Sequence, residues 1–147
     1  MNNKRILIVE DDRSFGSMLQ KWFDRNGFSA TLCSGMMAAQ EALSQSEPYQ
    51  IVLSDLRLPD GDGIMLLNWL KEKHLSVPVI IMTGYGEVQT AVSAIKLGAF
   101  DFLEKPINPD ILTKKIEAAF DGRQENISPP ARQTERKSYK EDKQFVK

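Results

Sequence analysis

Short apolar runs alternate with longer amphipathic stretches over most of this chain, and this alternation restricts the fold more than any other feature. Continuous apolar runs at 6–9, 51–53 and 77–82 predict strands that are buried on both faces. Weaker candidate strands lie at 29–33 and 99–103. Between the runs, apolar positions recur at helical spacing. The pattern predicts an α/β fold of five βα units, with helices on both faces of a parallel sheet.

Capping residues mark the starts of two of the expected helices. An apolar stripe with helical spacing begins at Phe15, and we expect Ser14 to cap this first helix. Asn108 can cap the fifth helix, because Pro109 then occupies the first helical position, where its missing N–H costs nothing. The stripe of the fourth helix, within 88–95, is narrow and weakly apolar. We therefore expect that helix to be held only loosely on the sheet.

The two ends of the chain differ in composition. Residues 1–122 carry the alternating pattern and form one expected domain, whereas 123–147 contain Pro129-Pro130, mixed charges and only five apolar side chains. We expect 123–147 to be a linker or a disordered tail. No apolar run is long enough for a membrane span or a signal peptide, so we expect a cytoplasmic protein. A single cysteine and a single histidine exclude a cysteine cluster or a zinc site.

Charged and hydroxyl side chains follow four of the five expected strands. Because the carboxyl ends of parallel strands meet at one edge of a sheet, these groups should converge there. Four carboxylates at that edge would repel one another unless a cation lay among them, and ligation by oxygen alone favours Mg²⁺. Which two of the first three carboxylates bind the metal stays open. The converging residues are Glu10, Asp11, Asp12, Asp55, Thr83 and Lys105.

This set of side chains is suited to phosphoryl transfer. The Asp55 carboxylate could attack a phosphoryl group, while Mg²⁺ and the Lys105 ammonium neutralise the equatorial oxygens and Thr83 donates a hydrogen bond to one of them. The sequence has no phosphate-binding loop of the nucleotide-binding type. The phosphoryl donor is therefore expected to be another phosphorylated molecule.

Four motifs resemble the receiver domains of two-component response regulators. They are VEDD at 9–12, LSDLRLPDGDG at 53–63, IMTG at 81–84 and FLEKP at 102–106. The resemblance covers about residues 4–122. It implies the flavodoxin-like, CheY-like (βα)5 fold, in which the five parallel strands have the order 2-1-3-4-5.

Carried onto this sequence, the resemblance implies a role for each site residue. Asp55 would be the phosphoacceptor. Glu10 and Asp11 would be the acidic pair at Mg²⁺, with Asp12 extending the acidic run and the main-chain carbonyl of Arg57 as a further ligand.

The same resemblance implies a switch and its partners. Thr83 would be the switch hydroxyl and Phe102 the switch aromatic, and Lys105 the active-site lysine, followed by a cis peptide bond at Pro106. The phosphoryl donor would be a sensor histidine kinase. The domain would only phosphorylate and slowly dephosphorylate itself, and would not be an enzyme acting on other substrates.

A narrower resemblance, within 83–102, is to the receivers of NtrC-type enhancer-binding transcription activators. In that class an AAA+ ATPase domain and a helix-turn-helix domain follow a linker, and residues 143–147 resemble the approach to such an ATPase. DNA would then be bound only through an output domain absent from this chain. A homodimer would form through the fourth helix, fifth strand and fifth helix. The alternative is a standalone receiver that acts on a protein partner.

Two other functions fit the predicted architecture less well. A phosphatase of the haloacid dehalogenase type needs a second aspartate two residues after its nucleophile, and Arg57 occupies that position. A flavodoxin-like FMN binder needs a phosphate loop after the first strand, where the three consecutive carboxylates at 10–12 would repel the phosphate.

Overall fold

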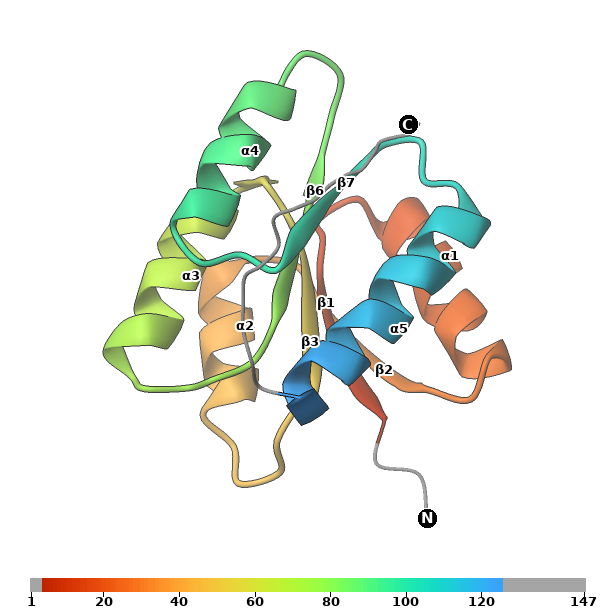
Figure 1. The fold of residues 1–147 in the computed structure, drawn as a ribbon, viewed down its shortest axis with the longest axis horizontal. Coiled ribbons are helices and arrows are strands. Elements are labelled where there is room, and N and C mark those ends of the chain that lie inside the picture. The colour runs from red at the N-terminus through yellow and green to blue at the C-terminus, as the bar shows by residue number, and fades with distance from the viewer. Residues whose placement is uncertain (1–3, 126–147) are drawn as a thin grey trace.

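Five parallel strands form the central sheet of the computed structural model, which describes residues 4–125 (Figure 1). The spatial order is β2-β1-β3-β6-β7, so the second, first, third, fourth and fifth strands of this sheet lie side by side as predicted. The apolar runs explain these strands, since every residue of β3 except the last is buried. The bounds are β1 (Arg5–Val9), β2 (Ser29–Cys33), β3 (Ile51–Asp55), β6 (Val79–Thr83) and β7 (Asp101–Glu104).

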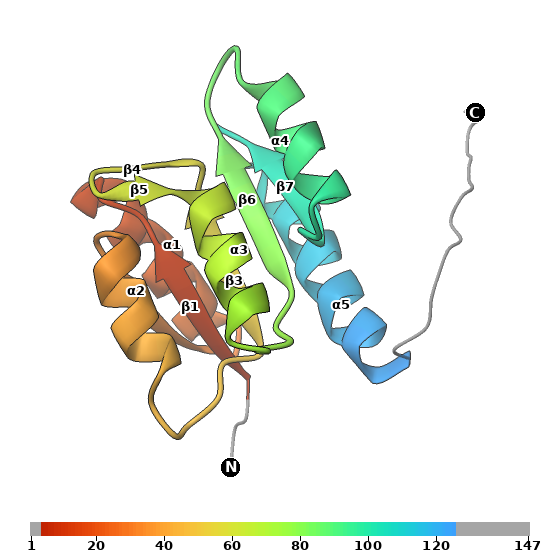
Figure 2. The same cartoon turned by 90° about the vertical axis from the view of Figure 1, so that its left-hand side faces the viewer.

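Five helices cover the two faces of this sheet. Helices α1 and α5 lie on one face, and α2, α3 and α4 lie on the other (Figures 1 and 2). None of the helices in this part of the chain is long and apolar enough to cross a membrane. The bounds are α1 (Arg13–Arg25), α2 (Met36–Leu43), α3 (Gly63–Glu72), α4 (Val88–Lys96) and α5 (Pro109–Glu125).

The alternation of side chains along β1 divides the core into two clusters. Ile6 and Ile8 pack with residues of α1 and α5, whereas Leu7 and Val9 pack with residues of α2, α3 and α4. All four side chains are fully buried. A strand with helices on both faces therefore has no polar face, which is why it reads as a continuous apolar run.

Several predicted boundaries change in the structure. Ser14 is not the cap of the first helix. Asp12 is, because its extended backbone precedes the helix and its carboxylate accepts a hydrogen bond from the Phe15 N–H at 3.1 Å. The strand expected at 77–82 begins at Val79, and the one expected at 99–103 begins at Asp101. Both apolar runs start in the loops that lead into these strands.

The end of the expected domain also differs slightly. The predicted cap Asn108 is confirmed, since its side chain accepts hydrogen bonds from the N–H groups of Asp110 and Ile111. Helix α5 continues to Glu125, past residue 122 where the sequence pattern ends. The rest of the expected linker or tail, 126–147, lies outside the described residues.

A small hairpin that the sequence did not predict follows β3. It consists of β4 (Arg57–Leu58) and β5 (Gly61–Asp62), which pair antiparallel. From its turn, the Asp60 carboxylate accepts hydrogen bonds from the N–H groups of Met36 and Met37, at 2.7 and 2.9 Å. These bonds lower the pKa of Asp60 below its usual value. The hairpin thus caps α2, whose own N-cap residue, Gly35, has no side chain to do so.

Gly63, the first residue of α3, allows the chain to pass close behind the end of β3. A Cβ atom at this position would lie 2.8 Å from Ile81 Cδ1 and 3.1 Å from the main-chain oxygen of Asp55. The second neighbour is backbone and cannot turn away. A glycine here lets α3 begin directly beside Asp55.

We expect Gly63→Ala to lower the free energy of unfolding by about 1–3 kcal/mol, because the added methyl group must displace the backbone at Asp55. Gly16→Ala is the matched control. Its Cβ would lie 2.8 Å from Leu32 Cδ1, the end of a flexible side chain, and alanine favours the helix. Denaturant unfolding of both variants checks this. Equal effects at the two positions would contradict the close approach at Gly63.

Candidate functional site

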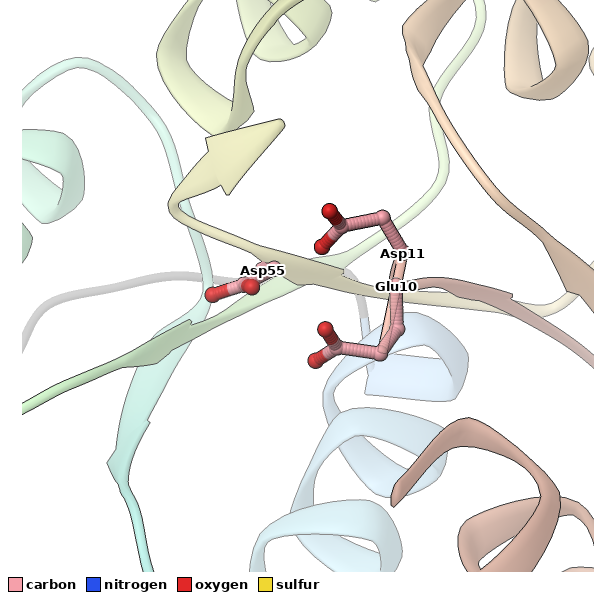
Figure 3. Close-up of side chains that lie close together, drawn as sticks. All are labelled: Glu10, Asp11 and Asp55. Atoms are coloured by element: carbon pink, nitrogen blue, oxygen red, sulfur yellow. The ribbon is translucent and has the colours of Figure 1, made fainter. Parts of the chain in front are cut away.

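The carboxyl ends of β1 and β3 bring three carboxylates together. Glu10 and Asp11 follow β1, and Asp55 is the last residue of the neighbouring strand β3 (Figure 3). One oxygen from each of the three lies within 4.8 Å of the others. Glu10 is buried, Asp55 is half-buried and Asp11 is exposed. The predicted convergence at this edge of the sheet is therefore present for these three residues.

The Lys105 ammonium lies between two of these carboxylates. Its Nζ is 2.8 Å from Glu10 Oε1 and 3.3 Å from Asp55 Oδ2. The main chain fixes the base of this side chain, since the Lys105 N–H donates to the main-chain oxygen of Thr83 at 2.8 Å. The peptide bond from Lys105 to Pro106 is cis, which confirms the expectation from the resemblance.

The pKa of Asp55 is raised because its carboxyl group is half-buried and lies beside a second carboxylate. Burial raises this pKa, and so does the charge of Glu10, while Lys105 opposes the rise; the result is a pKa of about 6. Burial also disfavours the Lys105 ammonium, but its hydrogen bond to Glu10 and the charges of Asp55 and Glu10 outweigh this and raise its pKa. The lysine therefore stays charged.

Asp12 has a different role from the other two residues of the acidic run. Its carboxylate caps α1, and its N–H donates to Glu10 Oε2 at 3.1 Å. The two oxygens of Glu10 are thus bonded to Lys105 and to Asp12. Among the described residues, none donates a hydrogen bond to the Asp11 carboxylate. Of the three consecutive carboxylates, Asp11 is the one most available to a cation.

The two expected switch residues lie on neighbouring strands. Thr83 ends β6 and is fully buried, and its hydroxyl donates to the main-chain oxygen of Gly84 at 3.4 Å. Phe102 is half-buried on β7, and the Lys115 ammonium lies 5.5 Å from the centre of its ring. Thr83 lies at the carboxyl end of the strand beside β3, whereas Phe102 pairs with Ile81 in the middle of β6, farther from the carboxylates.

Arg57 joins this site to α4 through its side chain. Its Nε donates to Glu87 Oε2 at 2.7 Å, and this bond and charge raise the pKa of Arg57. Glu87 is the N-cap residue of α4, but its side chain makes no capping bond. This pair was not predicted, because two charged residues 30 positions apart leave no local pattern in the sequence.

A second contact that was not predicted involves Phe15, whose ring centre lies 4.7 Å from the Lys105 ammonium. Its helical spacing gave a sufficient reason for an aromatic residue there, namely the apolar stripe of α1. The contact with Lys105 becomes visible only in the fold, where the start of α1 lies beside the loop that follows β7.

The chain matches the family model described as the response regulator receiver domain over residues 6–117. This match spans more than half of the chain and contains all the motifs on which the resemblance rests. The protein therefore belongs to the response regulator receiver family. Curated relatives that match this chain include receivers of the NtrC type.

Three curated relatives show how similar this chain is to known response regulators. The chain is 43% identical over 114 residues to the transcriptional regulatory protein FixJ of Bradyrhizobium diazoefficiens, covering 78% of this chain and 55% of FixJ. It is 36% identical over 124 residues to the DNA-binding transcriptional regulator NtrC of Escherichia coli, covering 84% and 26%. To the response regulator protein PilR of Pseudomonas aeruginosa it is 33% identical over 144 residues, covering 90% and 32%. The chain thus spans about half of FixJ and about a third or less of NtrC and PilR.

Solved structures agree on the fold. A response regulator receiver domain from Clostridium thermocellum superimposes with a TM-score of 0.79 at 23% identity, covering 84% of this chain and 99% of that one. Full-length FixJ from B. japonicum gives a TM-score of 0.76 at 41% identity, covering 83% and 60%. The five-stranded, doubly wound sheet is the CheY-like receiver fold.

The raised pKa of Asp55 predicts a pH dependence of stability in Mg²⁺-free buffer. The pKa of an unfolded aspartate is about 3.9. At pH values between ~4 and ~6 the folded chain therefore retains a proton on Asp55 that the unfolded chain has lost. Stability should therefore fall as the pH rises through this window. Asp55→Asn lacks this titration. We expect its stability relative to the wild type to increase by on the order of 2 kcal/mol from pH ~4 to ~7.

Urea unfolding of both proteins across this pH range measures that difference. A difference that stays constant with pH would show that the Asp55 carboxyl titrates at the same pH in the folded and unfolded chains.

Proposed function

We propose that this domain accepts a phosphoryl group on Asp55 from a phosphohistidine of a sensor histidine kinase, and that phosphorylation changes an output surface. The observation that carries the proposal is the contact of one ammonium, Lys105, with Asp55 and with the buried Glu10, beside a third carboxylate, Asp11. An aspartate nucleophile with a fixed cation beside it has what phosphoryl transfer requires.

The proposed step can be written with its atoms balanced. A carboxylate oxygen of Asp55 attacks phosphorus, an O–P bond forms, and the P–N bond of the phosphohistidine breaks with its electron pair leaving on the imidazole nitrogen. That nitrogen takes a proton from solvent. In the return step, water attacks phosphorus, inorganic phosphate leaves and the Asp55 carboxylate is restored. Lys105 remains charged throughout and offsets the negative charge on the phosphoryl oxygens.

The residues present suit a magnesium ion. Three carboxylates within 4.8 Å are hard oxygen ligands, and within residues 4–125 the ammonium of Lys105 alone forms ion pairs with them. We propose that Asp11 and Asp55 contribute ligand oxygens together with the main-chain carbonyl of Arg57, while Glu10 remains bonded to Lys105. A bound Mg²⁺ would supply charge neutralisation at the phosphoryl oxygens. Asp12, which caps α1, is not part of this proposed ligand set.

The output surface that we propose comprises α4, β7 and α5, with Thr83 and Phe102 as the residues that couple it to Asp55. Only Ala91 and Ala94 of α4 are buried, with Val88 and Thr90 half-buried, so the fully buried part of this helix is small. Such a helix can shift at low cost when the charge at the site changes. Exposed apolar side chains on and beside it, at Val92, Ile95, Leu97 and Phe100, support a role in contacting a second copy or another domain.

The activity of the whole protein is also a proposal, because the chain spans only part of its curated relatives. NtrC and FixJ are regulators of transcription, and PilR is a response regulator. We propose that this receiver controls transcription through an ATPase and DNA-binding part outside the given sequence. A standalone receiver that acts on a protein partner is the alternative. A native polypeptide with a mass close to 16.6 kDa would favour this alternative.

We expect acetyl phosphate with Mg²⁺ to add one phosphoryl group to the chain, because a small acyl phosphate can replace the phosphohistidine as donor. Asp55→Asn should remove this gain, since an amide is a poor nucleophile. Intact-mass spectrometry of both proteins, with and without Mg²⁺, makes the measurement. A gain of equal size in Asp55→Asn would assign the phosphoryl group to another residue and refute the proposal.

Mg²⁺ alone should raise the thermal midpoint of the wild-type protein, because a ligand bound only to the folded state stabilises it; at 100 times the dissociation constant the effect is about 2.7 kcal/mol. Asp11→Asn should lose this Mg²⁺ dependence. Asp12→Asn is the matched control, and it should keep the dependence because asparagine also caps helices. Differential scanning calorimetry across a Mg²⁺ titration measures all three. Loss of the dependence in Asp12→Asn alone would exchange the two roles.

A further inference from the structure

The Phe15 ring lies against the ammonium of Lys105, although Phe15 belongs to α1 and Lys105 follows β7. It sits in the first turn of α1, and the hydrogen bond from its N–H to Asp12 Oδ1 anchors its backbone at 3.1 Å. Its side chain is half-buried and packs against the cluster between the sheet, α1 and α5. The ring centre is 4.7 Å from Lys105 Nζ, within the range of a cation–π contact.

The Lys105 ammonium is thereby confined from three directions. Glu10 and Asp55 accept its hydrogen bonds, and the negative face of the Phe15 ring bounds it from the side of α1. A lysine side chain is flexible and has several rotatable bonds, so two hydrogen bonds alone leave it other conformations. The Lys105 side chain is 27% exposed, so water can compete for the ammonium wherever the protein does not cover it.

We propose that Phe15 is a positioning residue for phosphoryl transfer: its ring holds the Lys105 ammonium beside Asp55 and restricts its movement toward solvent. This inference rests on the proposed function and deepens it. The Phe15 ring carries no group that can bind a phosphoryl oxygen or a metal ion, so it acts only through Lys105. The competing explanation is that Phe15 fills space in the apolar stripe of α1, in which case any apolar side chain of similar size would serve.

An NMR experiment tests the contact without any phosphorylation. In the full 147-residue chain, the ε-methylene protons of Lys105 should be shifted upfield by the aromatic ring. Phe15→Leu should abolish the shift, and Phe15→Tyr, which keeps the ring face, should retain it. Wild-type ε-methylene protons with the shift of an exposed lysine would overturn the proposal.

A double-mutant cycle tests the functional consequence. We expect Phe15→Leu to slow phosphorylation by acetyl phosphate at saturating Mg²⁺ by about two- to fivefold, the size of a partly exposed cation–π contact. Phe15→Tyr should restore the rate. In the Lys105→Met background, Phe15→Leu should slow the reaction no further, because there is no ammonium left to position.

The outcomes separate the two explanations. An equal loss of rate from Phe15→Leu in both backgrounds, or an equal rate in Phe15→Leu and Phe15→Tyr, would overturn the positioning role in favour of simple packing. A wild-type chain that takes up no phosphate at all would refute the proposed function instead, and the ε-methylene shifts would still decide whether Phe15 holds Lys105. Thermal unfolding of each variant, Lys105→Met above all, establishes that it is folded at the temperature of the assay.

Discussion

The ammonium of Lys105 is the constraint on which the carboxyl edge of this sheet depends. Glu10 is 2% exposed, and a carboxylate buried to that extent is stable in its charged form only with a partner. Lys105 follows the edge strand β7, whereas Glu10 follows β1 and Asp55 ends β3, so the side chain reaches past β6 to bind both. Removing one member of a buried ion pair typically costs about 3–5 kcal/mol. Three strands that are not all neighbours are thus joined by a single charge.

One ammonium cannot balance three carboxylates, and this imbalance links the stability of the domain to its chemistry. Burial, together with the charge of Glu10, raises the pKa of Asp55 to about 6. Gathering these groups therefore costs stability when no other cation is present. The same arrangement of carboxylates makes this edge of the sheet a favourable binding place for a divalent cation. In the proposed reaction the cost is recovered when Mg²⁺ binds.

The apolar runs predicted a parallel sheet, and the convergence of its strand ends predicted the meeting of Glu10, Asp11 and Asp55. The order of the strands followed only from the resemblance to receiver domains. The sequence did not predict the cap of α1, because two nearby residues are equally suited to that position. Asp12 and Ser14 are both good caps, and only the backbone conformation decides between them. It could not show the capping of α2 by Asp60, since that hydrogen bond joins residues 24 positions apart and depends on the hairpin. The contact of Phe15 with Lys105 was not predicted either, because these two residues are also far apart in the sequence.

The contacts around α4 differ in kind from those at the centre of the sheet. Its only fully buried side chains are two alanines, and its N-cap residue, Glu87, pairs with Arg57 of the hairpin that follows β3. The Arg57 side chain is 65% exposed, and an ion pair so open to solvent contributes little to stability. Lys105 is instead held by a buried carboxylate and an aromatic ring. A change of charge at Asp55 would therefore displace α4 at a lower free-energy cost than it would displace Lys105. This difference in restraint favours α4 as the element through which the site acts on a partner.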